Sequence, residues 1–418
     1  MDSLKQETKK DRLIPYGRQW IDEADIKEVV EILRSDFLTQ GPKIEEFENS
    51  LAFYCCSKYA VAVSNGTAAL HLACLAANIG DGDRVISTPN TFVASTNCVL
   101  FCGGRPEFVD IETRTANIDA DKIEDFLGSL DAESVDKTKA IIPVHFAGLP
   151  CNMYKIKEIA VKHNLIIIED ACHALGAEYQ YNGKWNKVGS CNHSDMAVFS
   201  FHPVKHITTG EGGAVLTNSP ELYERLLSLR SHGITKNPEK FTNEYLAFND
   251  KSSSETKLPN PWYYEMHELG YNYRITDIQC ALGISQLKRI NESVERRKSI
   301  ASMYNNAFKD LQGVQVSLET ETERSSFHLY VLQIDFEKIG KSRAEVMHEL
   351  RKQGIGTQVH YIPVYLQPYY KERFHYDGAS YPVTETYYNR CLSLPIFPKM
   401  NNSEVDYVIE QVVNIFKM

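Results

Sequence analysis

The sequence predicts an α/β protein with a large domain built on a seven-stranded, mostly parallel sheet and a smaller C-terminal α+β domain. Seven apolar runs rich in valine, isoleucine and alanine lie between residues 60 and 218, and segments of helical composition or spacing separate them. Continuous apolar strands that alternate with helices are typical of a parallel sheet covered on both faces. A chain of 418 residues is also too long for one compact core.

Two amphipathic helices are expected before the first run. Apolar residues at 26, 29, 30 and 33 share one helical face, and a second helix begins at Pro42, since proline suits the first helical turn. Helices are also expected at 67–77 and 154–164. The seven strand-like runs are YAVAVS, DRVIST, PEFVDI, KAIIPVHF, LIIIED, DMAVFSF and GAVLTN.

The second half of the chain has fewer and more scattered elements. A polar stretch at 249–261 predicts a loop, and a long helix follows from about 275 into the 300s. The last third contains a strand HLYVLQIDF, a helix at 343–353, a strand TQVHYI and a final helix from Ser403. We therefore expect a disordered lead-in (1–13), a large domain (14–290, including the N-terminal helices and the 235–271 loop) and a small domain (291–418).

Composition excludes several classes of function. The net charge is −10 and no long basic run is present, which argues against nucleic acid as a partner. No apolar run is long enough to cross a bilayer, and the N-terminus lacks the apolar core of a secretory signal. The ten cysteines are scattered, as is typical of reduced thiols. We expect a cytoplasmic protein that does not bind a membrane.

Candidate chemistry lies where the predicted strands end, because ligands bind beyond the carboxyl ends of an open parallel sheet. The first strand ends in Ser64-Asn65-Gly66-Thr67 and a helix follows, so its free amides can bind an anion. Read alone, this stretch is equally an ordinary helix cap. LIIIED ends in Asp170, which is either a structural ion-pair partner or a carboxylate facing a cationic ligand.

The lysine after the sixth run is the third candidate. Lys205 lies just beyond DMAVFSF, and a lysine partly desolvated there can act as a nucleophile, although a solvated surface lysine is the more ordinary outcome. An anion site, a carboxylate and a reactive lysine at one sheet edge are the three groups that pyridoxal 5′-phosphate (PLP) requires. The pattern therefore predicts a PLP enzyme.

Several motifs resemble the DegT/StrS family of sugar-nucleotide aminotransferases. They are VSNGTAALHLA, TPNTFVAST, IIEDACHALGAEY, FSFHPVKHITTGEGGAVLTN, LRSHGI and LGYNYRITDIQCALGISQL, and the resemblance runs from about Ile14 to the C-terminus. It implies the PLP-dependent transferase fold of type I, that of aspartate aminotransferase. Some relatives carry histidine in place of the lysine and remove a hydroxyl group, so Lys205 favours transamination.

Within the family, FHPVKHITTGEGG, PWYYEMHELGYNYRITDIQ and VHYIPVYLQPYY look most like the UDP-4-amino-4,6-dideoxy-N-acetyl-β-L-altrosamine transaminases of pseudaminic acid biosynthesis. That likeness implies transfer of an amino group from glutamate, which leaves as 2-oxoglutarate, to C4 of a UDP-linked 4-keto-6-deoxy-N-acetylhexosamine. The reaction would be ping-pong by way of pyridoxamine phosphate. Another sugar isomer, another nucleotide (GDP or dTDP) or amination at C3 stays open.

The resemblance also implies roles for individual residues. Lys205 would bond to the cofactor aldehyde and carry protons, and Asp170 would pair with the pyridine nitrogen. Phe92 would stack on the ring, although core packing is its ordinary alternative, and His173 would lie near the phenolic oxygen. The phosphate would be held by the other cofactor residues: Gly66, Thr67 and Ser200 of the same chain and Asn272 of the neighbouring subunit.

Substrate contacts follow with less specificity. The family pattern places Tyr16, Thr39, Gln40, His360 and Tyr361 near the sugar, and a core histidine is nearly as good an interpretation of His360. Arg274 is a possible contributor to binding the carboxylates of glutamate. Because Asn272 would serve the neighbouring site, with the 235–271 loop leaning across, the resemblance implies a homodimer with shared active sites.

Three rival interpretations rest on other features. Tyr54 and Lys58 have the Tyr-xxx-Lys spacing of NAD-dependent sugar dehydratases, but no glycine fingerprint follows a first strand. A non-catalytic regulatory protein on a PLP fold is a second rival, which the intact cofactor residues disfavour. A zinc site of Cys191, His193 and His202 is the third, and its spacing fits no zinc pattern, so we expect no metal.

Overall fold

The computed structural model describes residues 13–248, 258–376 and 378–417. The expected lead-in at 1–13, apart from residue 13, and most of the expected loop at 249–261 lie outside these residues. Within the described chain, no helix is both long and apolar enough to cross a membrane.

The core of the fold is one seven-stranded sheet, and all seven predicted runs belong to it. Its strand order is β1-β9-β8-β5-β4-β2-β3. Only β9 runs against its neighbours β1 and β8, so the predicted mostly parallel sheet is confirmed. The strands are β1 (Tyr59–Val63), β2 (Arg84–Ser87), β3 (Arg105–Phe108), β4 (Thr138–Ile141), β5 (Ile166–Asp170), β8 (Met196–Ser200) and β9 (Gly213–Thr217).

Helices cover both faces of this sheet, as the apolar strands require. Alternate residues of β1 belong to different apolar clusters: Ala60 and Ala62 to one, Val61 and Val63 to the other. The first cluster includes side chains of α2 (Pro42–Cys55), α5 (Ala120–Ser129), α7 (Met153–His163) and α10 (Asp277–Leu287). The second includes α3 (Gly66–Ala76), α4 (Ala94–Phe101) and α8 (Pro220–Arg230). Short α6 (Ala132–Lys137) precedes β4.

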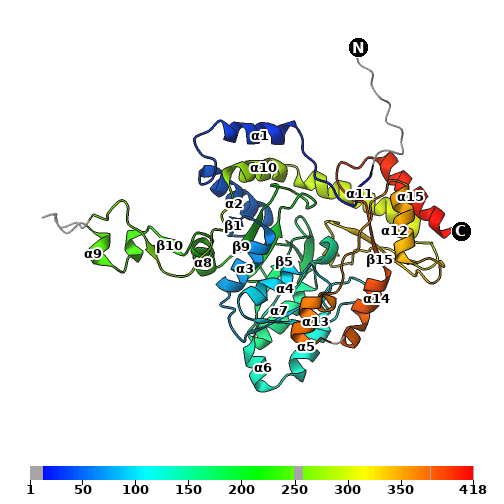
Figure 1. Cartoon of the computed structure of the whole chain (residues 1–418), viewed down its shortest axis with the longest axis horizontal. Coiled ribbons are helices and arrows are strands. Elements are labelled where there is room, and N and C mark those ends of the chain that lie inside the picture. The colour runs from blue at the N-terminus through cyan, green and yellow to red at the C-terminus, as the bar shows by residue number, and fades with distance from the viewer. Residues whose placement is uncertain (1–12, 249–257, 377, 418) are drawn as a thin grey trace, which may run out of the picture.

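The expected single helix from 275 onward is two helices. Helix α10 packs beside α1 (Glu23–Leu33), and α11 (Ile290–Phe308) continues toward the C-terminal part of the chain (Figure 1). The break falls at Arg289, whose backbone leaves the helical region (φ −116°, ψ 17°). Its guanidinium turns to Asp22, Asp25 and the carbonyl of Trp20, so the N-terminal segment is attached at this point.

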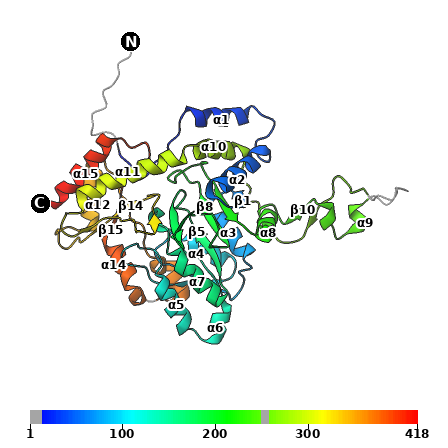
Figure 2. The same ribbon diagram turned by 180° about the vertical axis from the view of Figure 1, so that it is seen from behind.

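The C-terminal part contains a second, antiparallel sheet of three strands in the order β12-β14-β15: β12 (Val314–Gln315), β14 (Tyr330–Ile334) and β15 (Cys391–Leu394). It shares an apolar cluster with α11, α12 (Arg343–Lys352) and α15 (Asn402–Phe416), and Figure 2 shows these helices grouped at the C-terminal end. Ile14 joins the same cluster and forms a bridge with Ile355. Helices α13 (Pro368–Phe374) and α14 (Pro382–Arg390) precede β15 in the chain.

One strand prediction is wrong, and one hairpin was missed. TQVHYI is not a strand: Gln358 makes one isolated bridge to Ser393, and the following residues leave the small sheet to form a wall of the cleft described below. A hairpin of β6 (Glu178–Tyr181) and β7 (Lys184–Lys187) was not predicted. Its turn, Asn182-Gly183, has positive φ at both residues (49° and 74°), the geometry for which Asn-Gly is preferred. The two-residue strand β13 (Glu323–Arg324) extends it.

An arm projects from the body between α8 and α10 (Figures 1 and 2). It contains β10 (Ile234–Thr235), α9 (Glu244–Ala247) and β11 (Glu265–Met266), and β10 pairs with β11. The carboxylate of Glu265 organises it by accepting hydrogen bonds from the amides of Thr242 and Asn243, the hydroxyl of Tyr263 and the ring of His267. Several apolar side chains of the arm are exposed, among them Trp262 (75%) and Leu269 (76%).

Candidate active site

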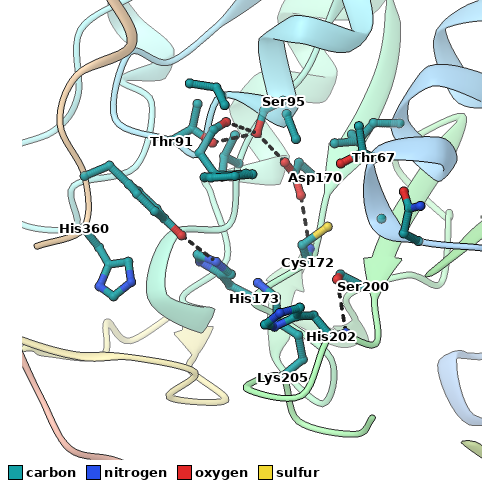
Figure 3. A pocket seen from close by; sticks show the side chains of 18 of the residues that line it. Thr67, Thr91, Ser95, Asp170, Cys172, His173, Ser200, His202, Lys205 and His360 are labelled. Atoms are coloured by element: carbon teal, nitrogen blue, oxygen red, sulfur yellow. Dashed lines mark hydrogen bonds between the residues drawn. The ribbon is translucent and has the colours of Figure 1, made fainter. Parts of the chain in front are cut away.

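A cleft of about 1000 Å³ opens at the carboxyl ends of the parallel strands. Its walls come from the residues that follow β1, β2, β5 and β8 and from the segment at 358–362. The structure brings ten of the predicted site residues together here: Tyr16, Gly66, Thr67, Phe92, Asp170, His173, Ser200, Lys205, His360 and Tyr361. Figure 3 shows the centre of this cleft.

The start of α3 forms one end of the cleft. Asn65 caps the helix by accepting from the amide of Ala68 at 2.8 Å. Over the described chain, the amides of Gly66 and Thr67 have no hydrogen-bond partner. A Cβ at Gly66 would lie 2.9 Å from Cβ of Ser200, so glycine lets β8 and the helix end approach closely. Unpaired amides and a hydroxyl at a helix N-terminus can bind an anion such as a phosphate.

Asp170 is the last residue of β5 and is 5% exposed. Its Oδ2 accepts a hydrogen bond of 2.6 Å from the hydroxyl of Ser95, and its Oδ1 accepts one of 3.2 Å from the amide of Cys172. These are its side-chain partners among the described residues, and no cationic side chain forms an ion pair with it there. The structural ion pair that was its alternative is therefore absent from this part of the chain, and the carboxylate faces the cleft (Figure 3).

Lys205 lies in the 201–212 connection between β8 and β9. Its amide donates to the carbonyl of His202 at 2.9 Å, and the amide of Thr209 donates to the carbonyl of Phe201 at 3.0 Å, so the loop is closed by its own backbone. The side chain extends toward Asp170 and His173 (Figure 3), and its amine has no hydrogen bond or ion pair within the described chain. Burial lowers the pKa of the Lys205 ammonium, against the opposing effects of Cys172 and Asp170.

His173 follows Asp170 by three residues and is held from two sides. Its Nε2 lies 3.1 Å from the hydroxyl of Tyr361, and its ring lies 4.3 Å from that of His328. Its Nδ1 is buried and has no partner within the described structure. Burial, with a further effect of nearby Lys205, holds the pKa of His173 well below its usual value, so the ring is neutral at physiological pH.

Three more predicted residues line the cleft. The ring of Phe92 is 57% exposed, so it does not serve core packing. His360 is buried, its Nδ1 lies 2.7 Å from the hydroxyl of Ser393, and burial lowers its pKa to about 3. Tyr16 packs on His360 with the ring centroids 5.5 Å apart.

Other predicted residues lie outside this cleft. Thr39, Gln40 and Asn272 are exposed, and Arg274 is half-buried beside β1. None of the four lines the cleft within this single chain. Tyr54 donates to Asn291, away from the cleft. In the described residues, Cys191, His193 and His202 form no group that could hold a metal ion.

Several cleft residues were missed in the sequence. Thr91 and Ser95 lie behind Asp170, and the signal was available: two hydroxyl residues four apart, after a strand and at the start of a helix. His328, which packs against His173, gave no such signal because only the fold brings the two rings together.

Comparison with known proteins gives the class of this site. Residues 19–413 match the model of the DegT/DnrJ/EryC1/StrS aminotransferase family. The spore coat polysaccharide biosynthesis protein SpsC of Bacillus subtilis is 40% identical over 410 residues, which cover 98% of both chains. The UDP-4-amino-4,6-dideoxy-N-acetyl-beta-L-altrosamine transaminase of Campylobacter jejuni subsp. jejuni (strain 81-176) is 37% identical over 405 residues, covering 97% of this chain and 98% of the relative.

Solved structures agree with this assignment. PseC of Helicobacter pylori, an aminotransferase involved in the biosynthesis of pseudoaminic acid, superposes with a TM-score of 0.84 at 31% identity, covering 97% of this chain and all of the other. The PLP form of the putative sugar aminotransferase Spr1654 of Streptococcus pneumoniae gives a TM-score of 0.83 at 30% identity, covering 97% and 99%. The chain belongs to the DegT/DnrJ/EryC1/StrS aminotransferase family and is a sugar aminotransferase with the aspartate-aminotransferase fold.

Proposed function

We propose that this enzyme uses PLP to move the amino group of glutamate to C4 of a UDP-linked 4-keto-6-deoxy-N-acetylhexosamine, as in pseudaminic acid biosynthesis. The observation that carries the proposal is the convergence on one cleft of the Lys205 amine, the Asp170 carboxylate and the open start of α3. The names of the Campylobacter and Helicobacter relatives supply the substrate class.

The cleft fits PLP at each of the points where that cofactor needs a partner. The free amides of Gly66 and Thr67 and the neighbouring Ser200 hydroxyl suit a phosphate. Asp170 offers a carboxylate without a cationic partner in the described chain. Lys205 offers an amine that likewise has no hydrogen bond or ion pair there. The chemistry of the donors therefore matches a phosphate, a pyridinium nitrogen and an aldehyde.

Bound PLP supplies a reactive aldehyde and a ring that accepts electrons from the substrate carbon. Lys205 would hold the aldehyde through its amine. Because burial lowers the pKa of Lys205, a larger fraction of its amine, when free, is neutral and can accept a proton. That amine would carry the proton that leaves the carbon of glutamate and the proton that is added to the carbon of the keto sugar.

The remaining cofactor residues orient and retain the ring. Asp170 would accept a hydrogen bond from the ring nitrogen and keep that nitrogen protonated. Neutral His173 would be placed at the phenolic oxygen, where its unpartnered Nδ1 could bond. Phe92, exposed on the cleft wall, would pack over the face of the ring.

We further propose that the enzyme is a homodimer with shared active sites. Asn272 is exposed and does not line the cleft of its own chain, so it is free to bind a phosphate held at Gly66 and Thr67 of a second copy. The arm that precedes Asn272, within 235–271, extends away from the body and exposes apolar side chains such as Trp262, as a segment that contacts a second copy would (Figure 2).

The sugar nucleotide is the ligand of the outer cleft. Tyr16, His360 and Tyr361 line it on the side away from α3, and Thr39 and Gln40 contribute from another copy of the chain. Arg274, half-buried beside β1, remains our candidate contributor for the carboxylates of glutamate. We assign residues 14–290 to the large domain and 291–418 to the small domain.

A second candidate substrate is another nucleotide-linked keto sugar, with a different isomer, nucleotide or carbon. The specific observation in its favour is the 40% identity to the spore coat protein SpsC, which exceeds the 37% identity to the altrosamine transaminase.

The visible absorption spectrum of the purified protein, before and after addition of glutamate, tests the proposal. We expect a yellow band that glutamate removes and that a keto sugar nucleotide restores, with Lys205→Ala lacking the normal response. The panel of UDP-, GDP- and dTDP-linked keto sugars then distinguishes the two substrate candidates. PLP binding with no response to glutamate would instead support a regulatory protein, and a protein that PLP cannot reconstitute would refute the assignment.

A further inference from the structure

A short chain of hydroxyl groups leads away from Asp170 along the wall of the cleft. The hydroxyl of Ser95 is 2.6 Å from Oδ2 of Asp170, and the hydroxyl of Thr91 is 2.7 Å from that of Ser95 (Figure 3). All three side chains are buried, with at most 5% exposure. Water therefore does not compete for these hydrogen bonds, and the loss of a donor would leave its acceptor unsatisfied.

Counting protons gives this chain a direction. Ser95 has one hydroxyl proton and two nearby acceptors, Asp170 at 2.6 Å and the carbonyl of Phe92 at 3.2 Å. The carboxylate is the shorter and charged acceptor, so it takes the proton. Ser95 then has none left for Thr91, and Thr91 must donate to Ser95. Hydrogen bonds therefore run from Thr91 to Ser95 to Asp170.

A purely structural role would use these hydroxyls differently. Ser95 lies in the first turn of α4, and serine and threonine beside a helix start ordinarily cap its free amides. Helix α4 nevertheless begins at Ala94 without a side-chain cap from Val93 or any other residue. The hydroxyl of Ser95 bonds to Asp170 instead, and that of Thr91 bonds to Ser95.

We propose that Ser95 and Thr91 are positioning residues that keep Asp170 ionised and directed at the ring nitrogen of PLP. The inference rests on the proposed function, because it requires PLP to bind with that nitrogen at Asp170. A hydrogen bond donated to a carboxylate favours its charged form. The proton shared between Asp170 and the ring nitrogen then stays on the nitrogen, where it lets the ring accept electrons.

Nitrogen NMR of the holoenzyme measures this proton directly. The enzyme is reconstituted with PLP carrying 15N in the ring, whose signal differs between a protonated and a neutral ring nitrogen. In Ser95→Ala we expect the protonated fraction relative to the neutral one to fall about tenfold, because a hydrogen bond to a charged group is worth about one pKa unit or more. The kcat should fall with it, and the KM for glutamate should change less.

Matched variants separate this role from packing. Ser95→Thr keeps the hydroxyl and should restore the signal of the parent enzyme. Thr91→Val, which removes only the second donor, should move the signal in the same direction by a smaller amount. Thr96→Val is the control: Thr96 is the next residue of α4, equally buried, but its hydroxyl pairs with Tyr370 at 2.8 Å rather than with Asp170. It should leave the nitrogen signal unchanged.

The outcomes distinguish this inference from the proposed function. If the parent holoenzyme shows a protonated ring nitrogen that Asp170→Asn abolishes, while Ser95→Ala and Thr91→Val leave it intact, the inference is wrong and the function stands. A parent protein that binds no PLP, or whose nitrogen signal is indifferent to Asp170→Asn, overturns the function as well. Should Ser95→Ala fail to fold, Thr91→Val decides: an unchanged signal refutes the role.

Discussion

The carboxyl edge of the large sheet and the projecting arm differ in what fixes their side chains. At the sheet edge, Asp170 is held by Ser95 and an amide, and Lys205 by a loop closed on its own backbone. The arm has its own internal organiser, Glu265, but its apolar side chains and the following Asn272 face solvent. Contacts within one chain thus fix Asp170 and Lys205, whereas the exposed apolar side chains of the arm and the side chain of Asn272 have no such contacts in the described chain.

The largest effect is expected from removing the amine of Lys205 at the carboxyl edge of the sheet. We expect Lys205→Ala to fold and bind PLP but to lose transamination by about 10³-fold or more, because no other described cleft residue offers a free amine. Steady-state kinetics with glutamate and a keto sugar nucleotide check this, with cofactor binding followed by absorbance. Turnover near that of the parent enzyme would remove Lys205 from the chemistry.

A smaller effect at the same sheet edge is expected from removing the charge of Asp170. Asp170→Asn keeps the size of the side chain but removes the charge and one of the two oxygens that accept from Ser95 and Cys172. We expect kcat to fall by about 10²-fold, the order of effect seen when one partner of a buried charge pair is lost. Thermal unfolding of the apoprotein serves as the control for folding, and an unaffected kcat would mean that another group pairs with the ring.

Mixing two defective variants tests the arm. We expect Asn272→Ala to lose about tenfold in activity, since a hydrogen bond to a phosphate is removed. If Asn272 serves the neighbouring site, a heterodimer with Lys205→Ala contains one intact site, so refolded equal mixtures should recover about a quarter of the parent activity. Should the mixture be no more active than the average of its components, the site is complete within one chain.

The smallest expected effect concerns the stability of the apoprotein. Burial lowers the pKa of Lys205 from its ordinary 10.5, so folding is opposed by the charged amine at neutral pH. Between the lowered pKa and 10.5 the unfolded chain binds the additional proton, and stability therefore rises with pH. We expect Lys205→Met to raise the melting temperature at pH 7 by about 1–2 °C, and the gain to shrink toward pH 10.5. A gain that grows with pH would contradict the sign.

The sheet and its cofactor edge could be predicted because local pattern and topology point to the same positions. Apolar runs set the strands, and the ends of parallel strands necessarily meet at one edge, so Gly66, Asp170 and Lys205 converge. The hairpin at 178–187 was missed although Asn182-Gly183 marks its turn, because its strands are polar. TQVHYI has strand-like alternation, but its residues form a cleft wall instead.

Residues whose place depends on distant contacts could not be predicted in this way. His328 meets His173 only after the small sheet has packed against the large one. Thr39, Gln40 and Asn272 came from the family resemblance alone, and a single chain leaves them exposed. Sequence pattern carries information about neighbours within a strand or helix, and much less about contacts between subunits.

The antiparallel direction of β9 has a consequence for how this chain can evolve. Since β9 starts at the edge where the parallel strands end, its first residue, Gly213, abuts the first turn of α3. A Cβ there would lie 2.6 Å from the carbonyl of Asn65 and 2.8 Å from the amide of Gly66, so even alanine would displace the start of that helix. We expect a saturation library selected for growth to tolerate glycine alone at position 213. Selection would then act on this residue through the backbone beside it and not through contact with a ligand.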